Sequence, residues 1–225
     1  MLKPIINLFF PEVCNACKNT LHDNEKYICT ICRHNLPVTN YHKTNDDFVK
    51  KVFYGRAKLE QATALLRFEK KGIVQQLLHD LKYREQQQIG TFLGKWLGIE
   101  LKETNNYNAI DMVIPVPLHK TKLRSRGYNQ VEKFGKEIAL ALNTEYQDKI
   151  LQKITNTSSQ VNKKRFARWQ NNTELFAVTN TQKLNNKHIL LVDDIITTGA
   201  TLEACIAELN KANNIKISIA TMAIA

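Results

Sequence analysis

One stretch near the end of the chain constrains the fold most: an apolar run that stops at two adjacent aspartates and continues into a threonine–glycine turn. The run Lys187–Val192 has strand length, and its lack of alternation indicates a strand covered on both faces. An apolar stripe at helical spacing then runs from Leu202 to Leu209. The stretch therefore predicts a buried strand, a tight turn and a helix, over the residues Ile189-Leu190-Leu191-Val192-Asp193-Asp194-Ile195-Ile196-Thr197-Thr198-Gly199-Ala200-Thr201.

The chain before this stretch alternates helical and extended patterns. Apolar residues recur at helical spacing over Ile73–Leu81, over Phe92–Leu101 and over about 130–142. Extended apolar runs occupy Ala109–Ile114 and, at the end of the chain, Ile215–Ala223. Strands and helices in alternation predict an α/β fold, with a mostly parallel sheet and helices on both of its faces.

The predicted turn has the properties of a phosphate site. Backbone N–H groups of Thr198–Thr201 can converge on one anion at the positive end of the following helix, and Gly199 allows a close approach. Asp193 and Asp194 would repel that anion unless they meet neutral or cationic groups. Ribose hydroxyls and a hydrated Mg²⁺ are such groups, so the pattern predicts a site for a phosphorylated ribose. The alternative is a capped helix after a strand whose two aspartates are merely solvated.

Two basic clusters accompany the turn. The first follows the strand that ends at Ile114 and places a cation at every second position, which suits a clamp for a polyanion. The second lies between two extended segments, Lys149–Ile154 and Leu175–Val178. A solvated basic face is the alternative for both clusters. The residues concerned are Leu118, His119, Lys120, Thr121, Lys122, Arg124 and Arg126 in the first cluster, and Lys163, Lys164, Arg165 and Arg168 in the second.

Four of the five cysteines form two C-x-x-C pairs near the start of the chain, Cys14 with Cys17 and Cys29 with Cys32. Each pair can present two sulfurs to one tetrahedral ion, so together they predict a closed, structural zinc knuckle with four cysteine ligands. A redox or iron–sulfur role is the alternative. Cys205 lies on the apolar stripe of the last helix and is expected to be a core thiol.

Composition divides the chain into a knuckle over residues 1–40, a polar connecting segment over 41–58 and the α/β domain over 59–225. The formal net charge of +11 favours anionic partners without choosing among them. No stretch approaches the roughly 18–20 apolar residues of a membrane span. The initial apolar run is too short and too interrupted for a signal peptide, so we expect a cytoplasmic protein with reduced cysteines.

The stretch Ile189–Thr201 resembles the signature of type I phosphoribosyltransferases at every position. The resemblance implies a phosphoribosyltransferase-like fold that binds phosphoribosyl pyrophosphate with Mg²⁺. It also implies that Asp193 and Asp194 hold the ribose 2′- and 3′-hydroxyls and that Thr197–Thr201 wrap the 5′-phosphate. In that fold class a pyrophosphate loop and a mobile hood occur at the places of the two basic clusters. Charge stabilisation of departing pyrophosphate would then involve Lys120, Lys122, Arg124 and Arg126.

The first basic cluster narrows the resemblance. Pro115-Val116-Pro117-Leu118, followed by Arg124-x-Arg126-Gly127-Tyr128-Asn129-Gln130, is similar to the ComF-type competence proteins, as are Leu81-Lys82-Tyr83 and the cysteine-rich start. Departures are Lys120 and Lys122, near positions where the family often has arginine, and Tyr128 in place of a frequent phenylalanine. The family implies a role in the uptake of external DNA.

Two functional hypotheses follow from the resemblance. The first is a phosphoribosyltransferase, whose acceptor no residue identifies. The second is a factor that senses the phosphoribosyl ligand without turnover and binds single-stranded DNA or other competence proteins. Its stacking platforms would be Tyr83, Tyr128 and Trp169, each of which lies beside cations. The amidophosphoribosyltransferase of purine synthesis shares the phosphate signature, but its glutamine-using reaction needs an N-terminal cysteine nucleophile. Position 2 is Leu2, so this reaction is not expected here.

Overall fold

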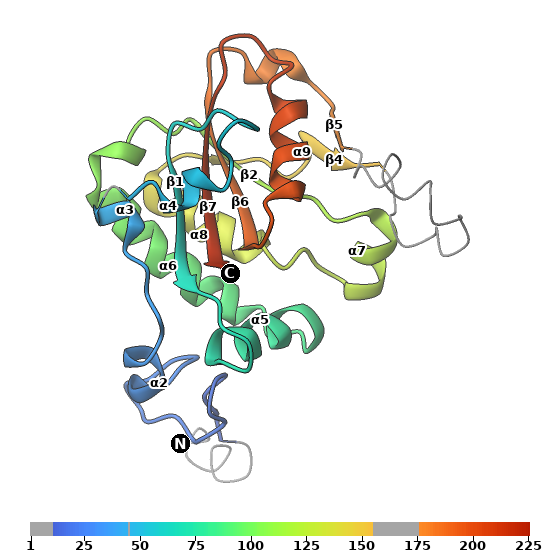
Figure 1. The fold of residues 1–225 in the computed structure, drawn as a ribbon. Coiled ribbons are helices and arrows are strands. Elements are labelled where there is room, and N and C mark those ends of the chain that lie inside the picture. The colour runs from blue at the N-terminus through green and yellow to red at the C-terminus, as the bar shows by residue number, and fades with distance from the viewer. Residues whose placement is uncertain (1–10, 45, 155–175) are drawn as a thin grey trace, which may run out of the picture.

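A parallel five-stranded sheet forms the centre of the structure, a computed structural model that describes residues 11–44, 46–154 and 176–225. Every neighbouring pair of strands in this sheet is parallel, as the apolar runs predicted. The strands in spatial order are β1 (Ala62–Arg67), β7 (Lys216–Ile224), β6 (His188–Ile196), β2 (Met112–Pro115) and β3 (Glu145–Tyr146) (Figure 1).

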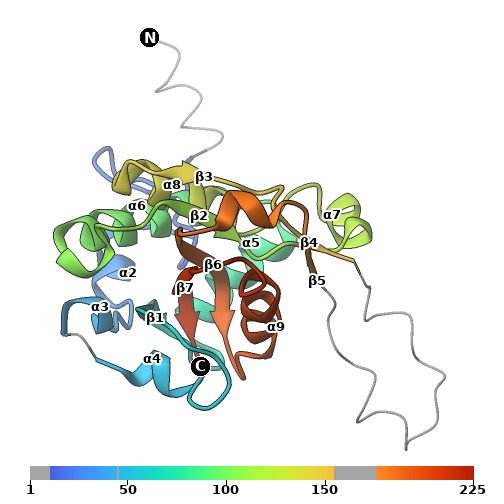
Figure 2. The same cartoon turned by 90° about the horizontal axis from the view of Figure 1, so that it is seen from above.

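Helices cover both faces of this sheet, which confirms the predicted α/β class. Figure 2 shows the sheet edge-on between α6 and α8 on one side and α9 on the other. The helices of the first side are α5 (Ile73–Tyr83), α6 (Gln88–Glu103) and α8 (Glu132–Leu142). The second side carries α9 (Ala200–Leu209), and Val49 and Phe53 are buried in the same cluster.

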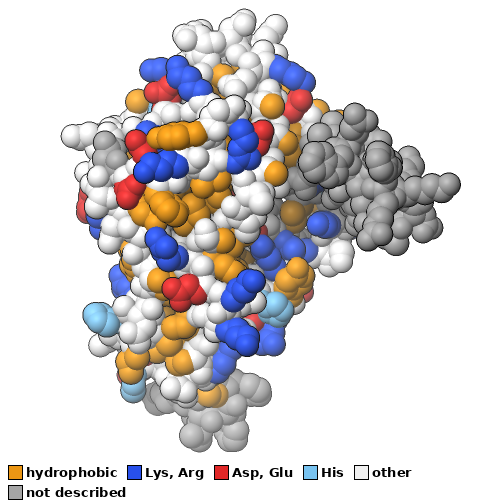
Figure 3. All heavy atoms as spheres, in the orientation of Figure 1, with side chains coloured by type: hydrophobic (Ala, Val, Ile, Leu, Met, Phe, Trp, Pro, Cys, Tyr) orange, Lys and Arg blue, Asp and Glu red, His pale blue; other side chains and the backbone are white. Residues whose placement is uncertain are grey.

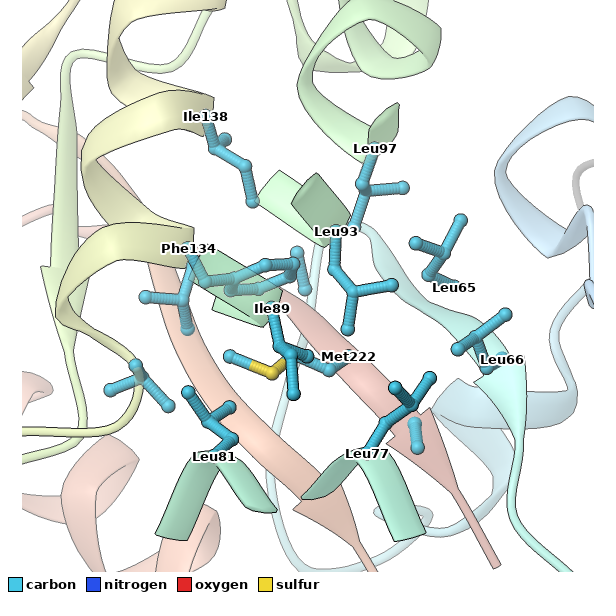
Figure 4. Packing of buried hydrophobic residues seen from close by; sticks show 14 of the residues in the cluster. Leu65, Leu66, Leu77, Leu81, Ile89, Leu93, Leu97, Phe134, Ile138 and Met222 are labelled. Carbon is cyan, nitrogen blue, oxygen red and sulfur yellow. The ribbon is translucent and has the colours of Figure 1, made fainter. Parts of the chain in front are cut away.

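Alternation along the strands divides the core into two parts. In β6, Leu190 and Val192 join the cluster packed under α5, α6 and α8, whereas Ile189 and Leu191 join the cluster under α9. Successive side chains of a strand point to opposite faces, so an unbroken apolar run is what a strand between two helical layers requires. Figure 4 shows the first cluster, where Met222 of β7 meets leucines of α5 and α6 and Phe134 of α8.

The knuckle and the segment after it both pack against the domain. Cys14, Ile28 and Leu36 are buried in the same hydrophobic cluster as α5 and α6. The segment expected to connect the two parts contains two short helices, α3 (Tyr41–Thr44) and α4 (Phe48–Lys51), which contact β1. The boundaries expected at residues 40 and 58 remain predictions. The one helix of the knuckle region is α2 (Thr30–His34) among the described residues.

The remaining described elements are small. The two extended segments expected around the second basic cluster pair antiparallel as β4 (Leu151–Lys153) and β5 (Phe176–Val178). That cluster itself, with Trp169, lies outside the described residues. Within the described part of the chain, none of the helices has the length and hydropathy needed to cross a membrane. Short 3-10 turns occupy Asn105–Tyr107 and Thr181–Leu184, and α7 occupies Lys120–Arg126.

The chain leaves β2 and β6 in opposite directions. After β2 it passes through α7 and α8 to β3 at one edge of the sheet, whereas after β6 it passes through α9 to β7 on the other side. Because α8 and α9 cover opposite faces, a crevice opens between the carboxyl ends of these two neighbouring strands. Open α/β sheets bind ligands at such a switch point. The topology therefore brings the first basic cluster and the two aspartates to one place.

Candidate anion-binding site and cysteine cluster

A cavity of about 320 Å³ lies at the carboxyl ends of β2 and β6. Its walls come from four parts of the chain: the end of β6 with the turn into α9, the loop after β2, the last turn of α5 and one face of α7. Leu118, Asp193, Asp194 and Thr197–Thr201 line it, as expected. His119, Lys120, Thr121 and Arg124 are not among the lining residues.

The turn into α9 has the conformation that an anion site needs. Gly199 has φ +78° and is the residue at which α9 begins, so the backbone turns sharply there. Thr197, Thr198 and Ala200 are exposed, and the first N–H groups of a helix have no partner within the helix. A side chain at position 199 would come within 2.8 Å of the Phe53 ring. Glycine is therefore required here for both conformation and space.

The two aspartates lie within β6 rather than after it. The strand runs past the predicted end at Val192 because β7 continues to pair with it as far as Ile196. Both carboxyl groups belong to buried residues, 8% exposed for Asp193 and 4% for Asp194. Asp193 Oδ1 accepts a hydrogen bond from the Asp194 N–H at 2.8 Å. The sheet thus holds the carboxylate pair in a defined orientation at the cavity wall.

Asp194 has two partners from distant parts of the chain. Its Oδ2 accepts a hydrogen bond from Gln130 Nε2 at 2.6 Å and lies 3.0 Å from Lys82 Nζ. Gln130 in turn accepts a hydrogen bond from Arg126 of α7. The buried carboxylate is therefore compensated by a cation and an amide, as a buried charge requires.

The first basic cluster forms a helix, and its four cations therefore lie on two different faces. The residues that the sequence places at alternate positions form α7, capped by His119, whose Nδ1 accepts a hydrogen bond from the Thr121 N–H. Residues four apart share one face of a helix. Lys122 and Arg126 consequently line the cavity, while Lys120 and Arg124 lie on another face and are exposed. The expected row of four cations is therefore two pairs, of which one faces the site.

Sequence reasoning missed four lining residues, Lys82, Tyr83, Gln130 and Lys153. The Arg126 guanidinium carbon lies 5.7 Å from the centre of the Tyr83 ring, and this tyrosine is 69% exposed. The signal for Lys82 and Tyr83 was present, since Leu81-Lys82-Tyr83 belongs to the family pattern and Tyr83 was expected to be a stacking platform, but neither residue was placed at the phosphate site. Gln130 also belongs to the family pattern but was given no role there, and Lys153 carries no such signal.

The cavity favours anions. Among the described residues that line it, four are cations (Lys82, Lys122, Arg126 and Lys153) and two are carboxylates. Figure 3 shows Lys and Arg side chains gathered on this face of the molecule. A concave site with an excess of one charge concentrates ligands of the opposite charge.

The four cysteine sulfurs lie within 4.8 Å of one another. Cys17 Sγ is 3.8 Å from Cys29 Sγ, and a tetrahedral ion with Zn–S bonds of about 2.3 Å would hold its sulfurs about 3.8 Å apart. Burial opposes ionisation of Cys14, but N–H groups of Cys17, Cys29 and Ala16 lower its pKa to about 7. The cluster is therefore compatible with zinc binding.

Comparison with known proteins finds a matching family model and similar curated proteins. The family model of the phosphoribosyl transferase domain matches residues 128–224. Competence protein F of Haemophilus influenzae is 28% identical over 130 residues, which cover 56% of this chain and 57% of that protein. DNA utilization protein YhgH of Escherichia coli O157:H7 is 25% identical over 129 residues, 56% of each chain. These matches support the resemblance to the ComF-type competence proteins. The chain spans about half the length of the curated relatives it matches.

Two solved structures show a more distant likeness to this chain. The glutamine phosphoribosylpyrophosphate amidotransferase of Bacillus subtilis is 17% identical with a TM-score of 0.39, covering 58% of this chain and 26% of that one. A hypoxanthine phosphoribosyltransferase of Staphylococcus aureus is 16% identical with a TM-score of 0.35, covering 60% and 62%. Neither likeness is close enough to bear on the site.

The domain match covers only part of the candidate site. It begins at Tyr128 and so includes α8, β6 with its two aspartates, and the turn into α9. Lys82, Lys122 and Arg126 lie before it, as do the four cysteines. The part of the cavity formed by α5 and α7 is thus built from residues outside the shared domain.

Proposed function

We propose that this ComF-type protein binds phosphoribosyl pyrophosphate together with Mg²⁺ in the cavity between β2 and β6. The observation that carries the proposal is the juxtaposition of an exposed Thr197–Thr201 turn, at the start of α9, with the buried pair Asp193 and Asp194. The turn offers backbone N–H groups to a phosphate, and the carboxylates offer acceptors to a diol. A sugar phosphate presents both groups at one end of the ligand.

The other end of the ligand is the pyrophosphate. Lys122, Arg126 and Lys153 line the same cavity and supply the positive charge that a pyrophosphate needs. Leu118 places the loop after β2 at the same wall. Carboxylate and phosphate oxygens suit Mg²⁺, which would supply further charge neutralisation when bound with the ligand.

Turnover would transfer the phosphoribosyl group to an acceptor that is still to be identified. The bond between ribose carbon 1 and the pyrophosphate oxygen breaks, and pyrophosphate leaves with the electron pair. A bond from the acceptor to carbon 1 forms, and the acceptor gives up its proton to solvent or a base. The residues of this chain would hold the sugar in place and stabilise the departing negative charge. Lys122 and Arg126 are positioned for this role, and Lys120 and Arg124 would have to reach it from the exposed face of α7.

Calorimetric titration with phosphoribosyl pyrophosphate and Mg²⁺ tests the proposal, with ribose 5-phosphate and pyrophosphate as partial ligands. The double variant Asp193→Asn, Asp194→Asn should lose most of the affinity. The chain offers a matched control in Asp46 and Asp47, another adjacent pair, exposed and away from the cavity. Asp46→Asn with Asp47→Asn should leave the affinity unchanged. Equal affinity of the two double variants, or no binding by the wild type, would contradict the proposal.

The second candidate function is a non-catalytic one, in which the bound ligand regulates binding of single-stranded DNA or of competence partners. One observation favours it: the exposed Tyr83 ring with Arg126 over it, at the rim of the cavity. Such a pair can stack a base and neutralise a backbone phosphate. Fluorescence anisotropy with oligothymidylate should then show affinity that falls steeply with salt and falls again in Tyr83→Ala. The name of Competence protein F supports a role in DNA uptake. We propose that this chain acts in the cytoplasm.

We also propose that Cys14, Cys17, Cys29 and Cys32 hold one structural zinc ion. The distances between their sulfurs support this. Elemental analysis of purified protein should find one zinc per chain, and Cys17→Ser should reduce it. Iron with visible absorbance would instead support the iron–sulfur alternative.

A further inference from the structure

The last turn of α5 is held from two opposite sides. Asp80 and Lys82 are two residues apart, so their side chains leave the helix in nearly opposite directions. Asp80 is turned toward the knuckle, where it pairs with Lys18, and Lys82 is turned toward β6, where it pairs with Asp194. One short piece of helix therefore lies between the cysteine cluster and the ribose carboxylates.

The knuckle side of this connection is an ion pair between a buried carboxylate and a partly exposed lysine. The Asp80 carboxylate is fully buried, and its Oδ2 lies 2.6 Å from Lys18 Nζ while its Oδ1 accepts a hydrogen bond from Gln76 Nε2 at 2.8 Å. Burial alone would raise the pKa of Asp80, but the hydrogen bonds from Lys18 and Gln76 hold that pKa below its usual value. Arg84 adds a second cation, with Nε 3.4 Å from Oδ1. Asp80 is thus ionised and depends on the knuckle for its closest cation.

The position of Lys18 is set by the first C-x-x-C turn. It follows Cys17 directly, and its backbone N–H donates a hydrogen bond to the Cys14 carbonyl oxygen at 2.9 Å. Its Nζ also donates to the Asn15 carbonyl oxygen at 3.0 Å, which directs the side chain back across the turn toward α5. A change in the cysteine turn would therefore move the cation that Asp80 needs.

The cavity side of the connection ends on a buried carboxylate. Lys82 Nζ lies 3.0 Å from Asp194 Oδ2, and the two side chains are 24% and 6% exposed. The intervening Leu81 is buried, and its carbonyl oxygen accepts a hydrogen bond from the Tyr128 hydroxyl. Asp80 and Lys82 belong to the same turn of one helix, so we expect a displacement at Asp80 to reach Lys82.

We infer that Lys82 neutralises Asp194 for binding of the phosphorylated ligand, and that Lys18 and Asp80 are positioning residues through which the cysteine knuckle holds Lys82 at the site. This inference rests on the proposed ligand. Two adjacent carboxylates beside a polyanion repel it, and a cation at 3.0 Å from one of them reduces that repulsion. Without Lys82 the site has to recruit more Mg²⁺ for the same purpose. The knuckle then has a function for the cavity although none of its cysteines lines it.

Single variants test the two ends of the connection. Lys82→Met should weaken binding of phosphoribosyl pyrophosphate by about tenfold or more and raise the Mg²⁺ concentration needed, whereas Lys82→Arg should restore most of the affinity. Lys18→Met, at a side chain 46% exposed, should weaken binding by about threefold to tenfold with unchanged zinc content. The matched controls are Lys95→Met on α6 and Lys26→Met in the knuckle, both lysines outside the cavity.

The double variant Lys18→Met, Lys82→Met separates positioning from general stability. If the knuckle acts through Lys82, the double variant binds no more weakly than Lys82→Met alone. If the double variant loses affinity by the product of the two single fold-changes, the inference is overturned. An unchanged affinity in either single variant would overturn it as well. A wild type that binds no ligand would instead overturn the proposed function itself.

Hydrogen exchange gives a reading that does not need the ligand. Lys18→Met should increase exchange in a peptide spanning Asp80–Tyr83 while Lys26→Met does not. Unchanged exchange there would refute the connection between knuckle and α5 even if the ligand binds as proposed.

Discussion

Replacing Gly199 by alanine perturbs the turn between β6 and α9 in two separable ways. The first is conformational, because Gly199 has φ +78°, a region in which a residue with a Cβ is strained. The second is steric, because an added Cβ would lie 2.8 Å from Cε1 and 3.0 Å from Cζ of Phe53 and 3.2 Å from Cγ1 of Val52. Phe53 is fully buried, so its ring cannot move aside freely.

The structure sets the size of each contribution. The left-handed backbone costs about 1–2 kcal/mol for a residue other than glycine. Forcing a methyl group against a packed ring costs about 1–3 kcal/mol. Gly199→Ala should therefore lower the free energy of unfolding by about 2–5 kcal/mol.

Gly127 provides a matched control for the conformational part. Its φ is +80°, and an added Cβ would meet nothing within 4 Å. Gly127→Ala should lower the free energy of unfolding by only about 1–2 kcal/mol. Urea unfolding followed by circular dichroism measures both variants against the wild type, and the difference between them isolates the contact with Phe53.

A second substitution tests whether the contact is the cause. Phe53→Leu removes the ring atoms that the new Cβ would meet, so the pair Gly199→Ala, Phe53→Leu should be less destabilised than the sum of the single variants. Equal costs for the two glycine variants, or strictly additive effects of the pair, would refute the packing argument. The space beside Phe53 would then be large enough for a methyl group, and glycine would be favoured at position 199 only because of the backbone conformation.

Further predictions concern pH, metal and the end of α5. Burial keeps the pKa of His42 and of His188 below the usual 6.5, so the unfolded chain takes up protons first as the pH falls. The free energy of unfolding should therefore decline below about pH 6.5, and it should decline less in His42→Gln. Urea unfolding at about pH 7.5, 6.5 and 5.5 measures this. A flat profile would contradict this. Chelation of the proposed zinc should increase hydrogen exchange over residues 11–36. It should also weaken ligand binding by as much as Lys18→Met does. Unaffected binding would count against the role given to the knuckle. Tyr128→Phe removes the hydroxyl that donates to the Leu81 carbonyl oxygen and should lower the free energy of unfolding by about 1–3 kcal/mol, whereas a change within error would mean that water replaces the donor.

Local patterns were sufficient for the elements around the phosphate turn. The apolar run before Asp193 predicts a strand covered on both faces, and Thr198–Thr201 with Gly199 predicts a helix start, because both depend on residues that are neighbours in sequence. The cysteine spacing is informative for the same reason. The end of β6 was misjudged, since pairing with β7, a partner distant in sequence, prolongs it past Val192.

The first basic cluster shows where the local pattern failed. Four cations at alternate positions would share one side of an extended loop, but the segment is the helix α7, in which residues four apart share a face. Gly127, which ends α7 in the left-handed conformation, is a helix-end signal, but the alternating charges were interpreted as a loop. Which two cations face the cavity was therefore decided by backbone conformation, not by the order of charges.

The sequence by itself determined the fold class, the place of the turn at Thr197–Thr201 and the cysteine cluster, because each depends on short-range periodicity or spacing. The tertiary structure alone decided which distant side chains compensate the buried carboxylates. Lys18 meets Asp80 across 62 residues and Gln130 meets Asp194 across 64. Such partners are chosen by the cost of leaving a buried charge unpaired, which arises only once the sheet and its helices have excluded water from both groups.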